Sequence, residues 1–130
     1  MEFREDKAIY LQIADCILDN ILSKSWRTGD RIPSVREMAI SIEVNPNTVM
    51  RTYTYLQDKG IIFNKRGIGY FVSENAYELA KNIKKEEFIK KQMPVFFRNM
   101  EMLNISFSEL RKLYEEFKNK DAGEENENYQ

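Results

Sequence analysis

The stretch NPNTVMR, residues 45–51, decides how the rest of the chain can be interpreted, because it has the composition of a helix start. Asn45 is a favourable N-cap, since its side-chain oxygen can accept a hydrogen bond from a backbone N–H of the first turn. Pro46 then falls at the first helical position, where its missing N–H costs no intrahelical hydrogen bond. The stretch therefore predicts a helix that begins at Pro46.

This helix carries polar side chains near its N-terminal end. Asn47, Thr48 and Arg51 suit contacts with phosphate oxygens or base edges. Asn47 and Thr48 could instead be ordinary surface residues, and Arg51 could instead pair with nearby acidic residues. The inward face of the helix is expected to contain Val49, Tyr53 and Leu56, with Thr52 at its margin. The pattern is typical of a DNA recognition helix.

A shorter helix is predicted immediately before it. Ser34 and Glu37 have the spacing of a capping box, in which each side chain accepts a hydrogen bond from the other residue's backbone N–H. The helix is expected to end near Ile42, so that Glu43 and Val44 form a turn. Two short helices joined by a turn of about three or four residues make a helix-turn-helix.

The flanking segments predict a winged arrangement. An apolar stripe of helical period indicates a first helix over about residues 8–24, and Arg31-Ile32-Pro33 is expected to be extended, as a possible short strand. Residues 61–73 hold two β-rich runs around a glycine-flanked basic tip, which predicts a hairpin. Lys65, Arg66 and Gly67 at this tip could approach a phosphate or enter a groove, or the two charges could only protect a sheet edge.

Beyond Glu74 the pattern changes to long amphipathic helices. One helix is expected from residue 76 to about 103, kinked or interrupted by Pro94. A second capping box, Ser106 with Glu109, opens a last helix that is expected to end near Phe117.

The predicted domains are 1–73, 74–118 and an acidic, disordered tail at 119–130. Two helices bury little surface by themselves. Their aromatic and methionine side chains therefore predict a partner, which is either the first domain or a second copy of the chain.

The composition argues against enzymatic chemistry. Apolar residues make up 42% of the 130 residues, and histidine, the commonest general base and metal ligand, is absent. The sequence has no phosphate loop, metal-ligand cluster or nucleophile elbow, so neither a cofactor nor a metal is expected. Neither a signal segment nor a membrane span is expected. Cys16 lies in an apolar helical pattern and is expected to be a buried, reduced thiol of a cytoplasmic protein.

The charge is unevenly distributed along the chain. The formal net charge is −1, but residues 24–66 hold eight Lys or Arg against four acidic residues. The last twelve residues hold one Lys against four acidic residues. A basic surface on an acidic protein is therefore expected around the helix-turn-helix.

Three motifs in this order resemble the GntR family of bacterial transcription regulators. GDRIPSVREMA at residues 29–39 resembles the family's G-x-x-[LI]-P-S-x-R-x-[LM]-A opening, and residues 44–49, Leu56 with 60–62, and residues 67–72 continue the resemblance. The match covers roughly residues 8–73. The N-P-N-T-V form and the short two-helix tail resemble the YtrA-type subgroup.

The resemblance implies a mainly α winged helix-turn-helix domain with a small β-hairpin and a C-terminal two-helix dimerisation appendage. It implies a homodimer through residues 74–118 on a double-stranded, palindromic DNA operator, usually repressing, near its own operon, with transporter genes as the expectation for the subgroup. It leaves open whether a small-molecule effector exists.

The family's residue roles carry over only where this sequence matches its motifs. Arg36 matches the arginine of P-S-x-R, whereas Pro46 and Met50 stand where many relatives have arginine, so base readout inferred from those relatives does not transfer. A cation in the first turn of a helix is disfavoured by the helix dipole, which favours a phosphate or guanine partner for Arg36. The expected DNA-binding residues are Ser34, Arg36, Asn45, Asn47, Thr48, Arg51, Lys65, Arg66 and Gly67.

Two other functional classes stay open. The winged helix could be a protein-interaction module without direct DNA readout. An enzyme is the weaker alternative, because the motifs that carry catalysis are missing from the sequence.

Overall fold

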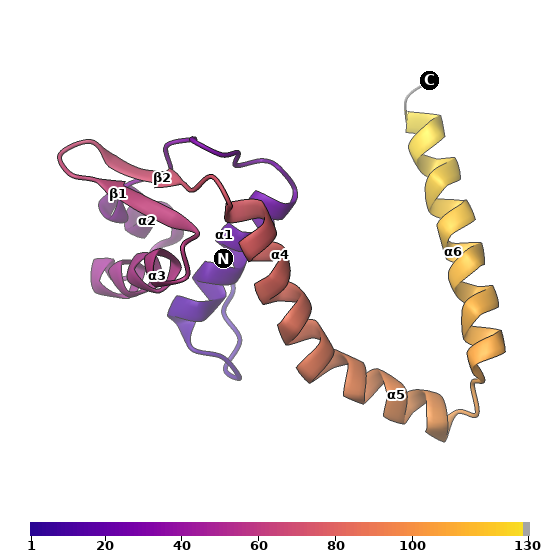
Figure 1. Ribbon diagram of the computed structural model, residues 1–130. Coiled ribbons are helices and arrows are strands. Elements are labelled where there is room, and N and C mark those ends of the chain that lie inside the picture. Colours follow the sequence, from indigo (N-terminus) through magenta and orange to yellow (C-terminus); the bar gives the residue numbers. More distant parts are fainter. Residues whose placement is uncertain (129–130) are drawn as a thin grey trace. The chain divides into compact units, whose positions relative to one another are not determined.

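The computed structural model describes residues 1–128, with side chains described through residue 123. Contacts divide the chain into two compact units, Met1–Glu86 and Glu87–Gln130. The first unit contains α1 (Ile9–Leu22), α2 (Val35–Ile42), α3 (Pro46–Asp58), β1 (Ile62–Lys65), β2 (Gly69–Val72) and nearly all of α4 (Ala76–Glu87) (Figure 1). The order is that of a winged helix-turn-helix, and the predicted mainly α fold with one hairpin is confirmed.

The core of the first unit lies where α3 packs against α1 and α2. Ile13 and Ile17 of α1 share a buried cluster with Val49 and Tyr53 of α3, and none of the four is more than 1% exposed. Full burial of one such side chain contributes about 1.5–3 kcal/mol. The buried side of α3 is thereby fixed, and its opposite side is left to solvent.

Both helices of the helix-turn-helix begin at the predicted caps. The Glu37 N–H donates to Ser34 Oγ at 3.1 Å, and the Ser34 N–H donates to Glu37 Oε1 at 3.4 Å. At α3 the Asn47 N–H donates to Asn45 Oδ1 at 2.8 Å. Glu43, between the helices, has the left-handed φ of 56°. These local contacts set the angle at which α3 leaves α2.

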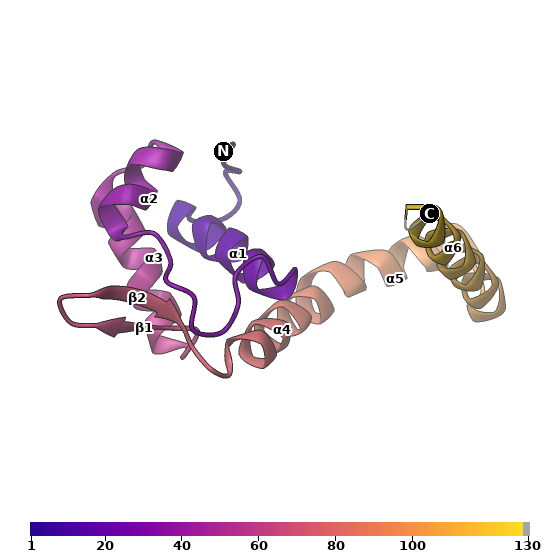
Figure 2. The same cartoon turned by 90° about the horizontal axis from the view of Figure 1, so that it is seen from above.

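The hairpin pairs antiparallel strands, with Phe63 opposite Phe71. The extended segment before α2 pairs with β2 through one antiparallel bridge, between Arg31 and Phe71. The Val72 N–H donates to the Asp30 carbonyl at 2.9 Å, and the Ile32 N–H donates to the Tyr70 carbonyl at 3.0 Å. The predicted extended conformation at residues 31–33 is consistent with this pairing. The tip of the hairpin projects beyond the helices of its unit (Figure 2).

Thr52 was expected at the margin of the buried face, and this prediction is wrong. Its side chain is fully buried, because position 52 lies three residues after Val49 and four before Leu56 on the same helical face. The hydroxyl donates to the Tyr10 carbonyl of α1 at 2.8 Å. The polar group is therefore satisfied, and it joins α3 to α1.

Cys16 was expected to be buried, and it is exposed. The apolar stripe of α1 faces the core, while Cys16 lies beyond its edge, near Asp15 and Asp19. Partial desolvation first, and then the negative charges of Asp19 and Asp15, raise the pKa of the thiol. A raised pKa disfavours the reactive thiolate, which argues against a redox role.

The second unit contains a π-helical turn, η1 (Phe88–Gln92), followed by α5 (Met93–Met102) and α6 (Phe107–Asn128). The predicted interruption at Pro94 is confirmed, since the π turn ends at Gln92 and Pro94 lies in the first turn of α5. Proline lacks an N–H, and its ring clashes with the carbonyl four residues earlier, so a regular α-helix cannot continue through it. The predicted cap at Ser106 is present, because its hydroxyl accepts from the Glu109 N–H at 3.1 Å.

The end predicted for the last helix near Phe117 is wrong. α6 continues to Asn128, into the range expected to be disordered. Glu occurs three times in this range, alongside one Lys and one Ala, and all three residue types have high helix propensity, so low hydrophobicity does not prevent a helix. The last two residues of the predicted tail, 129 and 130, lie outside the described residues.

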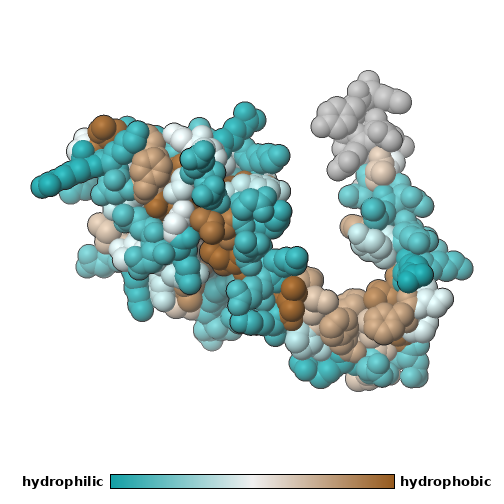
Figure 3. Space-filling model, viewed as in Figure 1, coloured by the Kyte–Doolittle hydropathy of each residue, from teal (hydrophilic) through white to brown (hydrophobic). Residues whose placement is uncertain are grey.

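The helices of the second unit leave most of their apolar side chains exposed. Apolar surface gathers along α5 (Figure 3). Among the described residues of this unit, Met100 is the one hydrophobic residue that is buried. None of the described helices is long and apolar enough to cross a membrane.

Candidate nucleic-acid interface

The outward side of α3 carries a row of accessible side chains. Asn47, Met50, Arg51 and Thr54 are all exposed, at spacings of three and four residues that place them on one face. Asn47 and Arg51 are among the predicted site residues, and the predicted Thr48 is half-buried at the edge of this face. Met50 and Thr54 were missed, although the same helical period, continued outward from the buried residues, identifies them.

Arg51 is supported by an aromatic ring rather than by an acid. Its guanidinium carbon lies 4.0 Å from the ring centroid of Tyr10, a cation–π contact that orients the planar group. Tyr10 in turn makes an edge-to-face contact with Tyr55, at 6.3 Å between centroids. Open hollows beside α3 are lined by Tyr10, Asn47 and Arg51. Tyr10 was missed because its place in the apolar stripe of α1 gave no signal of this contact.

Arg36 is exposed in the first turn of α2 and forms no ion pair with another described residue. Ser34, two residues earlier, uses an acceptor site of its hydroxyl for the cap, and the O–H can still donate. Asn45 is exposed as well, but its side-chain oxygen is engaged in capping α3. Of these three predicted residues, Arg36 is the one with a charge directed to solvent.

The hairpin tip presents the three predicted residues, Lys65, Arg66 and Gly67, and all are exposed. Lys65 Nζ lies 4.9 Å from the ring centroid of Phe71, which stacks on Phe63 with centroids 5.8 Å apart. Gly67 has the left-handed φ of 80° that the turn requires. The tip is therefore held by an aromatic pair beneath it.

Arg31 is a further basic residue at the hairpin, and it was missed as a site residue. A Cβ added at Gly69 would lie 3.0 Å from Arg31 Nε, so the guanidinium lies directly against this glycine. The position follows from the isolated bridge that pairs Arg31 with Phe71 of β2. The sequence suggested an extended segment here but did not indicate which strand it joins.

Hydrogen bonds connect these parts within the first unit. The Tyr53 hydroxyl of α3 donates to the Pro33 carbonyl, next to the cap of α2, at 2.6 Å. Burial, with smaller effects of Tyr70 and Glu37, raises the pKa of the Tyr53 phenol, so it remains a donor at neutral pH. The Tyr70 hydroxyl of the hairpin donates to Met50 Sδ at 3.9 Å. The start of α2, the outward side of α3 and the hairpin are thus joined by direct contacts.

Comparisons with known proteins agree with this geometry. The family described as "Bacterial regulatory proteins, gntR family" matches residues 9–72. The chain is 39% identical over 109 residues to the HTH-type transcriptional regulator YhcF of Bacillus subtilis, covering 84% of this chain and 88% of that protein. It is 44% identical over 73 residues to the HTH-type transcriptional repressor YtrA of Bacillus subtilis, covering 56% of each.

One solved structure resembles this chain over nearly the whole length of the solved protein. The putative transcriptional regulator of the GntR family from Bacteroides thetaiotaomicron is 49% identical, with a TM-score of 0.75, and the match covers 88% of this chain and 99% of that one. These relatives are transcription regulators and not enzymes. The chain belongs to the gntR family of bacterial regulatory proteins, and it is a DNA-binding helix-turn-helix transcription regulator.

Proposed function

We propose that this regulator is a dimeric repressor that binds a palindromic operator near its own operon. The observation that carries the proposal is the exposed row on α3, because the buried residues behind it fix which side chains can enter a major groove. Repression is supported by the relationship to YtrA, whose name describes it as a transcriptional repressor.

Each exposed group has a contact that suits its chemistry. Asn47 and Arg51 offer amide and guanidinium donors to base edges or phosphates, and Met50 offers an apolar surface of the kind that contacts a thymine methyl. Arg36 adds a phosphate or guanine contact from the start of α2. Ser34, Asn45 and Thr48 would contribute neutral hydrogen bonds around these charges.

The hairpin supplies the second set of contacts. Lys65 and Arg66, with Gly67 between the strands, would bind the flanking backbone or enter the minor groove, and Arg31 extends this basic surface. The DNA-binding part is then residues 1–73, within the larger compact unit that ends at Glu86.

Dimerisation through residues 74–118 is supported by the unburied apolar side chains of the second unit. A second copy would remove them from water. The exposed large hydrophobic residues in this region include Phe88, Ile89, Val95, Phe96, Phe97, Met102, Leu103, Phe107, Leu113, Tyr114 and Phe117. Two joined copies would read half-sites about one helical turn apart, ~10 base pairs centre to centre, or a multiple of it.

The regulated genes are proposed to include the regulator's own operon, with transporter genes as the first candidates. A protein that acts on the bacterial chromosome works in the cytoplasm, which is therefore the proposed compartment. No effector is assigned on these grounds.

The decisive experiment is a titration of a labelled promoter fragment from the protein's own operon, measured by fluorescence anisotropy at several salt concentrations. A shuffled duplex of the same length is the control. We expect preferential binding of the promoter. Its affinity should fall steeply as salt rises, because the Lys and Arg side chains release counterions from the phosphates when the protein binds. Equal binding of both duplexes, or no binding at moderate salt, would favour the protein-interaction module instead.

A further inference from the structure

A small pocket lies on the first unit, away from the exposed row of α3. Its volume is about 160 Å³, which is smaller than the roughly 300 Å³ at which pockets for drug-sized molecules begin. Ile21 and Val72, at 2% and 1% exposed, form part of its lining from the core side. Trp26 and Tyr77 add aromatic surface. The size and the lining suit one aromatic ring.

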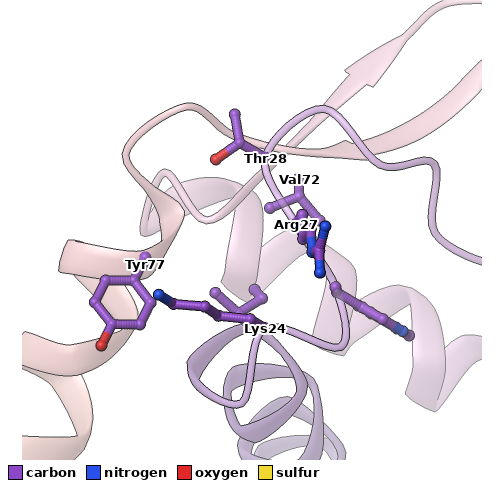
Figure 4. Close-up of a pocket in the computed structure, with 7 residues that line it drawn as sticks. Lys24, Arg27, Thr28, Val72 and Tyr77 are labelled. Carbon is purple, nitrogen blue, oxygen red and sulfur yellow. The ribbon is translucent and has the colours of Figure 1, made fainter.

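Two cations lie on this lining. Lys24 and Arg27 both line the pocket, and Lys24 Nζ lies 5.6 Å from the ring centroid of Tyr77 (Figure 4). None of the described residues that line the pocket is acidic. Within the part of the chain that the structure describes, neither cation forms an ion pair. The pocket is therefore apolar inside and positively charged at its edge.

The backbone at Lys24 is unusual for its residue type. Lys24 follows the C-cap of α1 with a φ of 63°, in the left-handed region where glycine or asparagine is normally found. A lysine there keeps a conformational cost that glycine would avoid. Lys24 nevertheless lines the pocket with its side chain despite this cost.

We propose that this pocket binds a single-ring aromatic monocarboxylate, with its ring on the apolar lining and its carboxylate between Lys24 and Arg27. Arginine can hold a carboxylate through two parallel hydrogen bonds, and lysine adds a point charge. The ligand would contact the loop after α1, the end of β2 and the start of α4. These segments are already close, since Thr28 Oγ1 donates to the Glu74 carbonyl at 3.4 Å.

The test uses the full chain without DNA, so it is independent of operator binding. Trp26 is the single tryptophan in the sequence, and its fluorescence reports directly on the pocket. Titration with sodium phenylacetate is expected to give a saturable change in Trp26 emission. Phenylacetamide, which has the same ring without the charge, is expected to bind at least about tenfold more weakly, because hydrogen bonds to charged groups are the stronger ones.

Three variants separate the site from the fold. Lys24→Gly removes the cation and relieves the backbone, so it should weaken phenylacetate binding about tenfold without lowering the melting temperature. Arg27→Gln should weaken binding by a similar factor. Lys85→Gln makes the same charge change on the exposed side of α4, outside the pocket, and should bind like the wild type. An absent or unsaturable signal with phenylacetate, equal binding of the amide, or normal binding by both pocket variants would overturn the proposal.

Discussion

The charged groups of Arg51 and Arg36 lie in different surroundings. Arg51 rests on the Tyr10 ring, which limits the rotamers of a side chain that would otherwise lose considerable entropy on binding. Arg36 is exposed at the start of α2, where the helix dipole opposes its charge in the free protein. DNA phosphates would reverse that unfavourable field, so both residues gain from the same partner.

Arg51→Ala and Arg36→Ala should each weaken operator binding by about 1–3 kcal/mol while leaving the melting temperature nearly unchanged. Anisotropy titrations at several salt concentrations measure the effect. A residue that contacts a phosphate should lower the salt slope by about one when it is removed, whereas a base contact should change sequence preference.

Lys120→Ala, on the exposed part of α6 beyond the proposed dimerisation segment, is the matched control for these two variants. If both arginine variants bound the operator like this control, their assignment to the interface would be wrong.

At the scale of elements, α3 is positioned by contacts of its buried side with two other segments. Thr52 joins it to α1, and Tyr53 joins it to the segment before α2. Both side chains are buried, so water does not compete for these two hydrogen bonds. The orientation of the exposed row of α3 is thus fixed by the buried side of the helix.

Thr52→Val should therefore destabilise the first unit by about 1 kcal/mol, because an isosteric side chain fills the space but loses the hydrogen bond to Tyr10. Urea denaturation followed by circular dichroism measures the change. Thr54→Val, on the exposed face of the same helix, provides a control for β-branched substitution in α3. Equal stabilities of the two variants would contradict a structural role for the Thr52 hydroxyl.

The elements were predictable from sequence wherever neighbours along the chain determine them. Ser34 and Asn45 cap helices through bonds to residues two or three positions away, and Pro94 interrupts its helix through its own ring. Contacts between distant segments were not predictable in this way. The Tyr10 support of Arg51 and the place of Arg31 beside Gly69 depend on packing that no local pattern encodes.

At the scale of the whole molecule, the compact unit extends past the hairpin. Ala76 and Ala80 of α4 are fully buried in the core of the first unit, with Leu79 and Ile83 packed against it. Residues 74–86 therefore have a structural role in the unit that carries the DNA-binding face, whatever their role in dimerisation.

Two truncations separate these roles. A chain ending at Glu86 should fold and be monomeric by light scattering, with weaker operator binding because bivalency is lost. A chain ending at Ser73 should in addition lose stability, since it lacks the buried side chains of α4. A dimeric chain ending at Glu86 would show that the second unit is not required for association.

The cap at the start of α3 also has a consequence for the chemical ageing of the protein. Asparagine usually deamidates when the backbone nitrogen of the next residue attacks the side-chain carbonyl. At Asn45 that nitrogen belongs to Pro46, which has no hydrogen to lose, and the side-chain oxygen is held by the Asn47 N–H. The residue that caps α3 is thus protected from the spontaneous reaction that would place a negative charge at the start of the proposed recognition helix.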